Sequence, residues 1–225
     1  MEDTALVKVF RRLSQGSKQS VQSGQELDVF DKYMHVSRPI DKAVKDAMDD
    51  IRQEGGGLLF LVGSAGDGKS HMISTLKKEY SDFIFKNDAS ESPWPTVDSI
   101  DALKIFLADF KDATLHTTNS KMLVAINMGK LSAFTDDAEV QANFPEIVKC
   151  AKTLFDEDNL RHEETKRVRI VSFANHQIFE IFPEQKDTKY PVDSLFIKNV
   201  LGKITNTAYD NEFRTAFNPK KRFKM

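Results

Sequence analysis

The sequence has very little of several residue types that mark whole classes of protein. A single cysteine, Cys150, has no second ligand at metal-binding spacing, and we expect it to be a small core residue in a reduced compartment. Ten glycines and seven prolines among 225 residues exclude a collagen-like or low-complexity chain. The longest purely apolar runs, 58–62 and 122–126, are five residues each. They are far shorter than the roughly 20 residues that cross a bilayer as a helix.

Charge and the N-terminal segment narrow the possibilities further. The segment MEDTALVKVFRRL carries acids at once and lacks the apolar core of a signal peptide, so we expect a cytoplasmic protein. The formal net charge of −2 gives no global attraction to nucleic acid. No acid follows Glu212, however, and the last twelve residues contain five positive charges: Arg214, Lys220, Lys221, Arg222 and Lys224. Such a tail can contact DNA phosphates, and a solvated terminus or a segment cut from a longer chain is the alternative.

The apolar pattern changes its period along the chain. Helical spacing over 5–13 and 40–52 predicts two helices, with a Ser/Gln/Gly-rich mobile linker at 14–25 between them. From residue 58, short apolar runs alternate with amphipathic segments, which is typical of a parallel sheet buried on both faces. The predicted strands are 58–62, 83–85, 122–126 and 168–173, and the predicted helices that follow are 69–80, 100–110, 145–155 and 194–204. Segment 178–182 fits either a fifth strand or a helix.

These patterns predict an α/β fold of the P-loop NTPase type, AAA-like, with a doubly wound, mostly parallel sheet and helices on both faces. The expected domains are an N-terminal helical extension with a mobile linker at 1–54, a P-loop core at 55–212 and a basic tail at 213–225.

Six of the ten glycines fall within residues 55–68, where the predicted strand 58–62 leads into a full match to the pattern G-x-x-x-x-G-K-[ST]. A strand before this pattern and an amphipathic helix after it form the context in which it binds nucleotide phosphates. The predicted nucleotide-binding residues are Gly63, Ser64, Ala65, Gly66, Asp67, Gly68, Lys69 and Ser70. The alternative is a glycine-rich turn that holds no ligand.

Each residue type in the motif has a physical task. Gly63, Gly66 and Gly68 let backbone N–H groups turn inward to form an anion-binding concavity, and the following helix adds its positive N-terminal end. We expect Lys69 to reach the β- and γ-phosphates of ATP, and the Ser70 hydroxyl to be a metal ligand for Mg²⁺. ATP and Mg²⁺ are therefore the predicted cofactors.

Hydrolysis requires an additional acid, because an active P-loop ATPase holds Mg²⁺ with a carboxylate at the end of a second buried strand. The third predicted strand ends in Asn127, which carries no negative charge. The other acids near strand ends are Asp88 and the pair Asp136 and Asp137, in what we expect to be a loop. Asp88 is the better substitute, since it follows a strand at the edge where ligands bind, although capping of a loop is an alternative role.

Asn175 follows the fourth predicted strand. A polar residue there can reach between the γ-phosphate and a bound water, the role called sensor in AAA-type ATPases, whereas capping of a loop is the alternative. Lys69, Asp88 and Asn175 are therefore the candidate catalytic residues. No motif surrounds Arg214, which argues against an arginine finger.

Two segments carry a resemblance to a known family. LFLVGSAGDGKSH at 59–71 and AINMGKL at 125–131 resemble the DptF family, P-loop components of the bacterial DNA phosphorothioation-dependent restriction system. The resemblance covers residues 33–175 and implies a cytoplasmic protein that binds nucleotide at 63–70. It also implies DptG- and DptH-like partners and the restriction of DNA that lacks the phosphorothioate modification. The resemblance supplies no catalytic acid, and without a recognisable nuclease motif DNA cleavage is expected to lie elsewhere.

Three functions remain open at this point. The first is an ATP-binding subunit of a DNA restriction, or anti-phage defence, complex, in which the nucleotide state controls engagement of partners or DNA. The second is a nucleotide-binding scaffold without turnover. The third is a small-molecule kinase, against which stands the absence of an arginine-rich lid motif. Oligomer formation is compatible with each of them.

Overall fold

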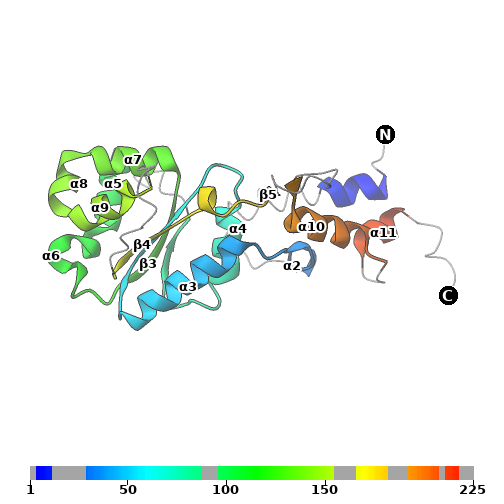
Figure 1. The fold of residues 1–225 in the computed structure, drawn as a ribbon, viewed down its shortest axis with the longest axis horizontal. Coiled ribbons are helices and arrows are strands. Elements are labelled where there is room, and N and C mark those ends of the chain that lie inside the picture. The colour runs from blue at the N-terminus through cyan, green and yellow to red at the C-terminus, as the bar shows by residue number, and fades with distance from the viewer. Residues whose placement is uncertain are drawn as a thin grey trace. The chain divides into compact units, whose positions relative to one another are not determined.

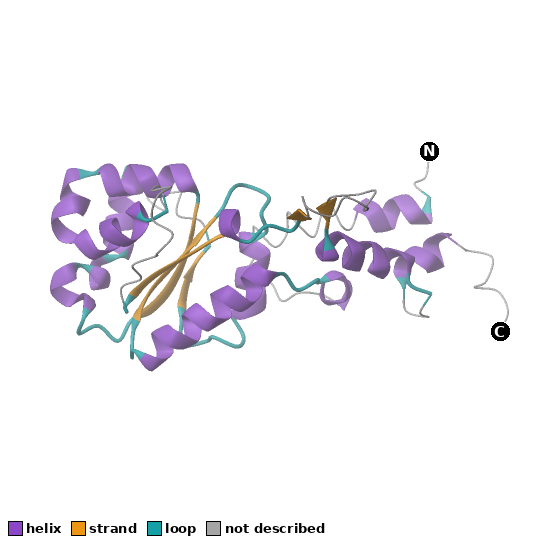
Figure 2. Cartoon of the chain, in the orientation of Figure 1, coloured by secondary structure: helices purple, strands orange, loops and turns teal. Residues whose placement is uncertain are grey.

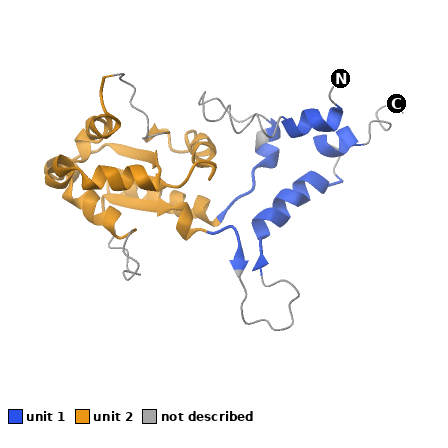
Figure 3. Ribbon diagram, turned by 90° about the horizontal axis from the view of Figure 1, so that it is seen from above, with its two compact units in different colours: residues 1–38, 177–225 blue, residues 39–176 orange. Residues whose placement is uncertain are grey.

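The computed structural model describes residues 4–11, 29–87, 96–154, 166–181, 192–207 and 211–217. The chain divides into two compact units, Pro39–His176 and a second unit made of Met1–Arg38 with Gln177–Met225 (Figure 3). Among the described residues, no helix has both the length and the apolar character needed to cross a membrane.

The unit Pro39–His176 is built on a four-stranded sheet in which every neighbouring pair is parallel (Figures 1 and 2). In sheet order the strands are β2 (Ile84–Lys86), β3 (Lys121–Ile126), β1 (Gly57–Val62) and β4 (Val168–Ser172). The predicted α/β class and parallel sheet are confirmed, and each strand end lies within one residue of its predicted position. β1 therefore lies in the interior of the sheet, between β3 and β4.

Helices cover both faces of this sheet because alternate residues of β1 point to opposite sides. Leu58, Phe60 and Val62 belong to one buried cluster, and Leu59 and Leu61 to another. The second cluster is covered by α3 (Pro39–Gln53) and α4 (Lys69–Leu76). The first is covered by α5 (Ser99–Phe106), α6 (Asp112–Leu115), α7 (Met128–Asp136), α8 (Ala138–Asn143) and α9 (Pro145–Lys152) (Figure 1).

The units divide the chain differently from the predicted domains. The predicted N-terminal extension ended at residue 54, but α3 belongs to the unit that contains the sheet. The reason is its fully buried stripe, which packs in the same cluster as Leu59 and Leu61: Ile40, Val44, Met48 and Ile51. Residues 177–212, predicted as part of the core, belong to the other unit. The predicted linker at 14–25 lies outside the described residues.

Several predicted helices end early. The helix predicted at 69–80 ends at Leu76, and the one predicted at 100–110 ends at Phe106 and is followed by a 3-10 turn, Ala108–Phe110. The prediction that Asp136 and Asp137 lie in a loop was wrong for Asp136, the last residue of α7, whereas Asp137 is the N-cap of α8. Its carboxylate accepts from the backbone N–H groups of Glu139 and Val140, which is the usual reason for an aspartate at this position.

In the second unit, a buried asparagine joins two helices. Asn211 donates its side-chain amide to the carbonyls at the end of α10 (Leu195–Thr205), including that of Ile204 at 3.1 Å. Its side-chain oxygen accepts from Phe213 N at 3.0 Å, at the start of α11 (Glu212–Phe217). One side chain thereby satisfies carbonyls of one helix and a first-turn amide of the next.

This unit also contains a helical segment at 5–11, where a helix was predicted over 5–13, together with α2 (Val29–Met34) and two short strands. The strand candidate at 178–182 forms β5 (Glu180–Ile181), which pairs antiparallel with β6 (Val192–Asp193) and is no part of the four-stranded sheet. Residue 182 lies outside the described residues.

An arginine clasp holds α3 to the chain that follows α4. The guanidinium of Arg52 donates to the carboxylate of Asp82, with Nε at 3.1 Å from Oδ2, and Arg52 Nη2 donates to Glu79 O at 3.0 Å. The Arg52 guanidinium carbon also lies 4.2 Å from the centroid of the Tyr80 ring. The hydrogen bond from Arg52 lowers the pKa of Asp82 to about 2.

We expect the stabilisation from this clasp to depend on pH in acid. The pKa of Asp82 is lower in the folded chain than the roughly 3.9 of an unfolded aspartate, so its contribution is complete above that value and is lost as the pH falls through about 2. Asp82→Asn should therefore lower the free energy of unfolding at pH 7 by up to about 1 kcal/mol, given the partial exposure of the pair.

Urea denaturation of wild type and Asp82→Asn between pH 7 and pH 2 measures this difference. The difference in the free energy of unfolding between the two proteins should decrease as the pH falls below about 4. A difference that stays constant would show that the charge of Asp82 is not involved. Asp46→Asn, in an exposed pair with Lys42 on α3, is the matched control.

Candidate functional site

The loop 63–68 lies where β1 ends, at the carboxyl edge of the sheet. Gly63 N donates to Ile126 O at 3.1 Å, which ties the start of the loop to the end of β3. The register pairs Val62 with both Ile126 and Ser172, so the loop begins between the ends of β3 and β4. Ligands of open parallel sheets bind at this edge.

Glycine is needed in the loop for two different reasons. Gly66 and Gly68 have φ of +91° and +92°, a region that side chains disfavour. At Gly63 the reason is close approach, because a Cβ there would lie 2.7 Å from Asp67 Oδ2 and 2.7 Å from Phe173 Cδ2. The sequence predicted unusual backbone geometry at all three positions, and the structure assigns it to left-handed φ at two and to contact at the third.

The start of α4 is suited to an anion. Gly68 is the N-cap residue, no side chain in the described chain caps this end, and the first turn contains no acid. A helix N-terminus carries a partial positive charge on its N–H groups, which favours a negatively charged ligand. Ser70, the predicted Mg²⁺ ligand, is part of this first turn and is partly buried.

The charged side chains of the loop bind the loop itself. Lys69 Nζ donates to Gly63 O at 2.6 Å and to Ser64 O at 2.7 Å. Asp67 Oδ2 accepts from Ser64 N at 2.5 Å, and Asp67 N donates to Ser64 O at 3.4 Å. The predicted nucleotide-binding residues therefore form one closed turn, in which Ser64 is contacted by both charged side chains.

Asn127, which stands where an acid was expected, has a structural task. Its Oδ1 accepts from Lys130 N at 2.7 Å and so caps the N-terminus of α7. One of the two lone pairs of this oxygen is thus engaged by the helix. Asp88, the predicted substitute, lies outside the described residues.

Sequence reasoning missed Asn87, directly after β2. Its Oδ1 is buried and has no hydrogen-bond partner in the described structure, which is costly for a polar atom. Lys86 pairs with Val124, two residues before the end of β3 at Ile126. Asn87 therefore lies about one residue short of the end of β3. The signal that could have identified it was an uncharged polar residue close behind the apolar segment 83–85.

Asn175 ends a 3-10 turn, Phe173–Asn175, that follows β4. Its side chain is exposed and makes no hydrogen bond in the described part of the chain. The turn is held by Ser172, whose Oγ accepts from Ala174 N at 3.2 Å and whose carbonyl accepts from His176 Nδ1 at 3.0 Å. The structure brings Phe173 of this turn against Gly63, but it shows no contact of Asn175 with the loop.

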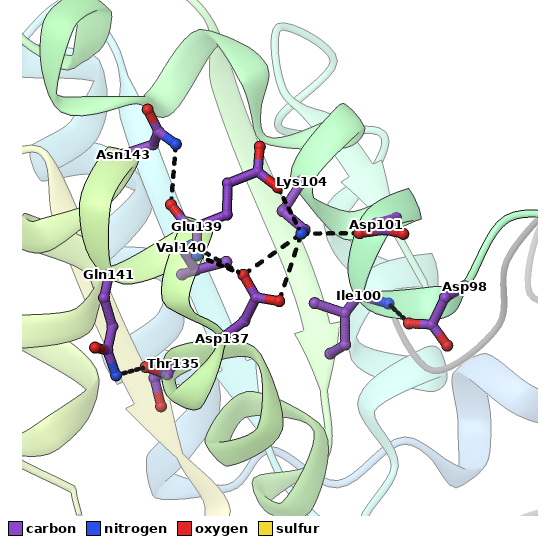
Figure 4. Close-up of polar contacts among 10 residues, drawn as sticks. All are labelled: Asp98, Ile100, Asp101, Lys104, Thr135, Asp137, Glu139, Val140, Gln141 and Asn143. Carbon is purple, nitrogen blue, oxygen red and sulfur yellow. Dashed lines mark hydrogen bonds and ion pairs between the residues drawn. The ribbon is translucent and has the colours of Figure 1, made fainter.

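A cluster of charged side chains surrounds Lys104 on α5 (Figure 4). Lys104 Nζ lies 2.8 Å from Asp101 Oδ1, 2.8 Å from Glu139 Oε2 and 3.4 Å from Asp137 Oδ1. Hydrogen bonds to Asp101 and Glu139 raise the pKa of Lys104, so it stays protonated and cannot act as a base. The pKa of Asp137 is lowered chiefly by the hydrogen bond from Val140 N. Through its contact with Lys104, Asp137 joins α5 to the start of α8 and is not part of the loop 63–68.

The structure describes only part of the predicted basic tail. Arg214 lies in α11, and its Nη1 donates to Thr207 O, within its own unit. The other cations of the predicted tail lie outside the described residues. Among the described residues, no group of three or more histidine, cysteine or carboxylate side chains could hold a metal ion.

Comparison with known proteins does not identify a family, because no family model, curated protein or solved structure matches this chain. The interpretation of the site therefore rests on its own geometry.

Replacement of Gly63 by alanine tests the close approach at the start of the loop. The new Cβ would meet Asp67 and Phe173 at 2.7 Å, so Gly63→Ala should lower the free energy of unfolding by about 1–3 kcal/mol. Gly129→Ala is the control, because a Cβ at this helical position meets only Asn127 Oδ1, at an ordinary 3.7 Å.

The control should stabilise by at most about 0.5–1 kcal/mol, since alanine is favoured over glycine in a helix and Gly129 lies in the first turn of α7. Urea denaturation of both variants measures the two effects. Equal stability of Gly63→Ala and wild type would contradict the packing at the start of the loop.

Proposed function

We propose that the chain binds ATP through loop 63–70, as P-loop NTPases do. One observation carries the proposal. The fully buried strand β1 is followed by a loop with two left-handed glycines, and the loop leads into α4, whose N-terminus no described side chain caps. Successive inward N–H groups followed by a helix N-terminus form an anion-binding concavity.

The residues of the loop fit a polyphosphate and a metal ion. Lys69 reaches back over the loop to two carbonyl oxygens, so its ammonium already lies at the loop that would hold the phosphates. The Ser70 hydroxyl, one position later, is the group that would hold Mg²⁺. When bound, Mg²⁺ supplies neutralisation of phosphate charge.

Hydrolysis of ATP would require a carboxylate to hold Mg²⁺ beside the phosphates. Asn127 caps α7 and carries no charge, so it cannot take the part of the carboxylate that normally holds Mg²⁺ at a neighbouring strand end. Asp88 and Asn175 stay candidates for the catalytic acid and the sensor. The cap at Asn127 favours the second candidate function, a nucleotide-binding scaffold in which ATP orders the fold and an interface without being hydrolysed.

At the level of the cell, we propose an AAA-like subunit of a DNA phosphorothioation-dependent restriction complex. Support comes from the resemblance of 59–71 and 125–131 to the DptF family. On this proposal the protein is cytoplasmic, works with DptG- and DptH-like partners, and engages DNA directly or through them. Its nucleotide state controls that engagement.

Replacement of Lys69 tests nucleotide binding. Loss of a charge-assisted contact to phosphate should weaken the binding of Mg-ATP about 10- to 100-fold in Lys69→Ala. Isothermal titration calorimetry measures the affinity, and Lys78→Ala removes the same charge from an exposed position beyond the other end of α4. Binding that is equal in the two variants, or absent from the wild type, would refute the proposal.

The same proteins separate the ATPase from the scaffold. Phosphate release by the wild type that Lys69→Ala abolishes would establish an ATPase. Tight binding without release, even with partners and DNA present, would establish the scaffold.

A further inference from the structure

The loop assigned to nucleotide phosphates contains a carboxylate of its own. Asp67 occupies one of the four variable positions of the P-loop motif. Its Oδ2 lies 2.5 Å from Ser64 N, and a Cβ at Gly63 would lie only 2.7 Å from the same oxygen. The carboxylate therefore folds back over the start of the loop and accepts from a loop N–H group.

The lysine of the motif is engaged at the same place. Lys69 Nζ donates to Gly63 O and Ser64 O, the carbonyls on either side of the N–H that Asp67 accepts. An anion and a cation from the loop thus converge on residues 63 and 64. In this arrangement the loop satisfies its own polar groups, and the ammonium that would bind phosphate is held on carbonyl oxygens.

A phosphate and a carboxylate compete in such a loop for a simple reason. Both are anions that accept hydrogen bonds from backbone N–H groups, and two negative charges a few ångströms apart repel each other in a partly solvated site. The positive end of α4 and the ammonium of Lys69 attract either anion. A nucleotide therefore enters against the charge of Asp67 and draws Lys69 away from its carbonyl partners.

We infer that Asp67 is an internal competitor of the nucleotide phosphates, which holds the loop in a self-occupied form and sets a limit on nucleotide affinity. This inference rests on the proposed function and deepens it, since it concerns how the same loop is regulated. A free nucleotide without Mg²⁺ carries the larger negative charge, so the competition is strongest against it. The loop thereby favours the Mg²⁺ complex of a nucleotide over the free anion.

A purely structural role of Asp67 makes a different prediction. If the carboxylate only braced the loop, an asparagine would serve equally well, because its side-chain oxygen can accept from Ser64 N. An alanine would remove the brace and weaken nucleotide binding. Under competition, Asp67→Asn removes the charge, keeps the acceptor and tightens binding, and Asp67→Ala tightens it as well.

The experiment is isothermal titration calorimetry of ATP with wild type, Asp67→Asn, Asp67→Ala and Lys69→Ala, each with Mg²⁺ and with EDTA. Asp46→Asn is the control for net charge, because it removes one carboxylate from an exposed position on α3. We expect Asp67→Asn to bind ATP about tenfold more tightly than wild type in EDTA, equal to about 1.4 kcal/mol. The gain should be smaller with Mg²⁺, and Asp46→Asn should match the wild type.

Each contrary outcome has a definite meaning. Unchanged affinity in Asp67→Asn with weaker binding in Asp67→Ala would show a brace and overturn the inference. Weaker binding of Mg-ATP in Asp67→Asn would show that Asp67 stabilises the nucleotide-bound state, which would also overturn the inference. In both cases wild-type binding that is lost in Lys69→Ala leaves the proposed function standing, whereas no binding by wild type or Asp67→Asn overturns the proposed function and the inference together.

Discussion

The structure depends on the placement of β1, which is hydrogen-bonded on both edges and buried along its whole length. Parallel pairing to β3 and β4 brings the ends of three strands to one edge. The bond from Gly63 N to Ile126 O carries this register one residue beyond the strand and into the loop. The loop therefore begins at a point fixed by a rigid sheet, as a site for a charged ligand requires.

The groups that suit the loop to phosphate also need partners when no phosphate is bound. A buried or partly buried ammonium without an acceptor is costly, and Lys69 finds two carbonyls of its own loop. Asp67 closes the same turn from the other side. The proposed ligand thus replaces existing contacts, so nucleotide affinity depends on the difference between the two sets.

Much of the fold was predictable from the sequence because its strongest signals are local. Run 58–62 is apolar without a break, as a strand buried on both faces must be, and Gly66 and Gly68 stand where the backbone turns left-handed. The pair α7 and α8 was missed because their boundary is set by Asp137, whose capping bonds and contact with Lys104 join segments far apart in the sequence. Spacing along the chain does not reveal such contacts.

The position of the candidate site was predictable from the sequence, but the contacts within it were not. The motif located the loop, and the lack of charge at Asn127 was visible in the sequence. Its engagement as the cap of α7 was not, since that depends on how the chain turns after β3. The partnerless oxygen of Asn87 is likewise a property of burial, which appears only once β2 is packed beside β3.

A crystal structure of the protein with Mg²⁺ and a non-hydrolysable ATP analogue tests the central claim most directly. The account predicts that the phosphates occupy the turn between Gly66 and Ser70. It also predicts that Lys69 Nζ leaves the carbonyls of Gly63 and Ser64 to contact the phosphates. A structure in which Lys69 keeps both carbonyl contacts and the nucleotide binds elsewhere would contradict it.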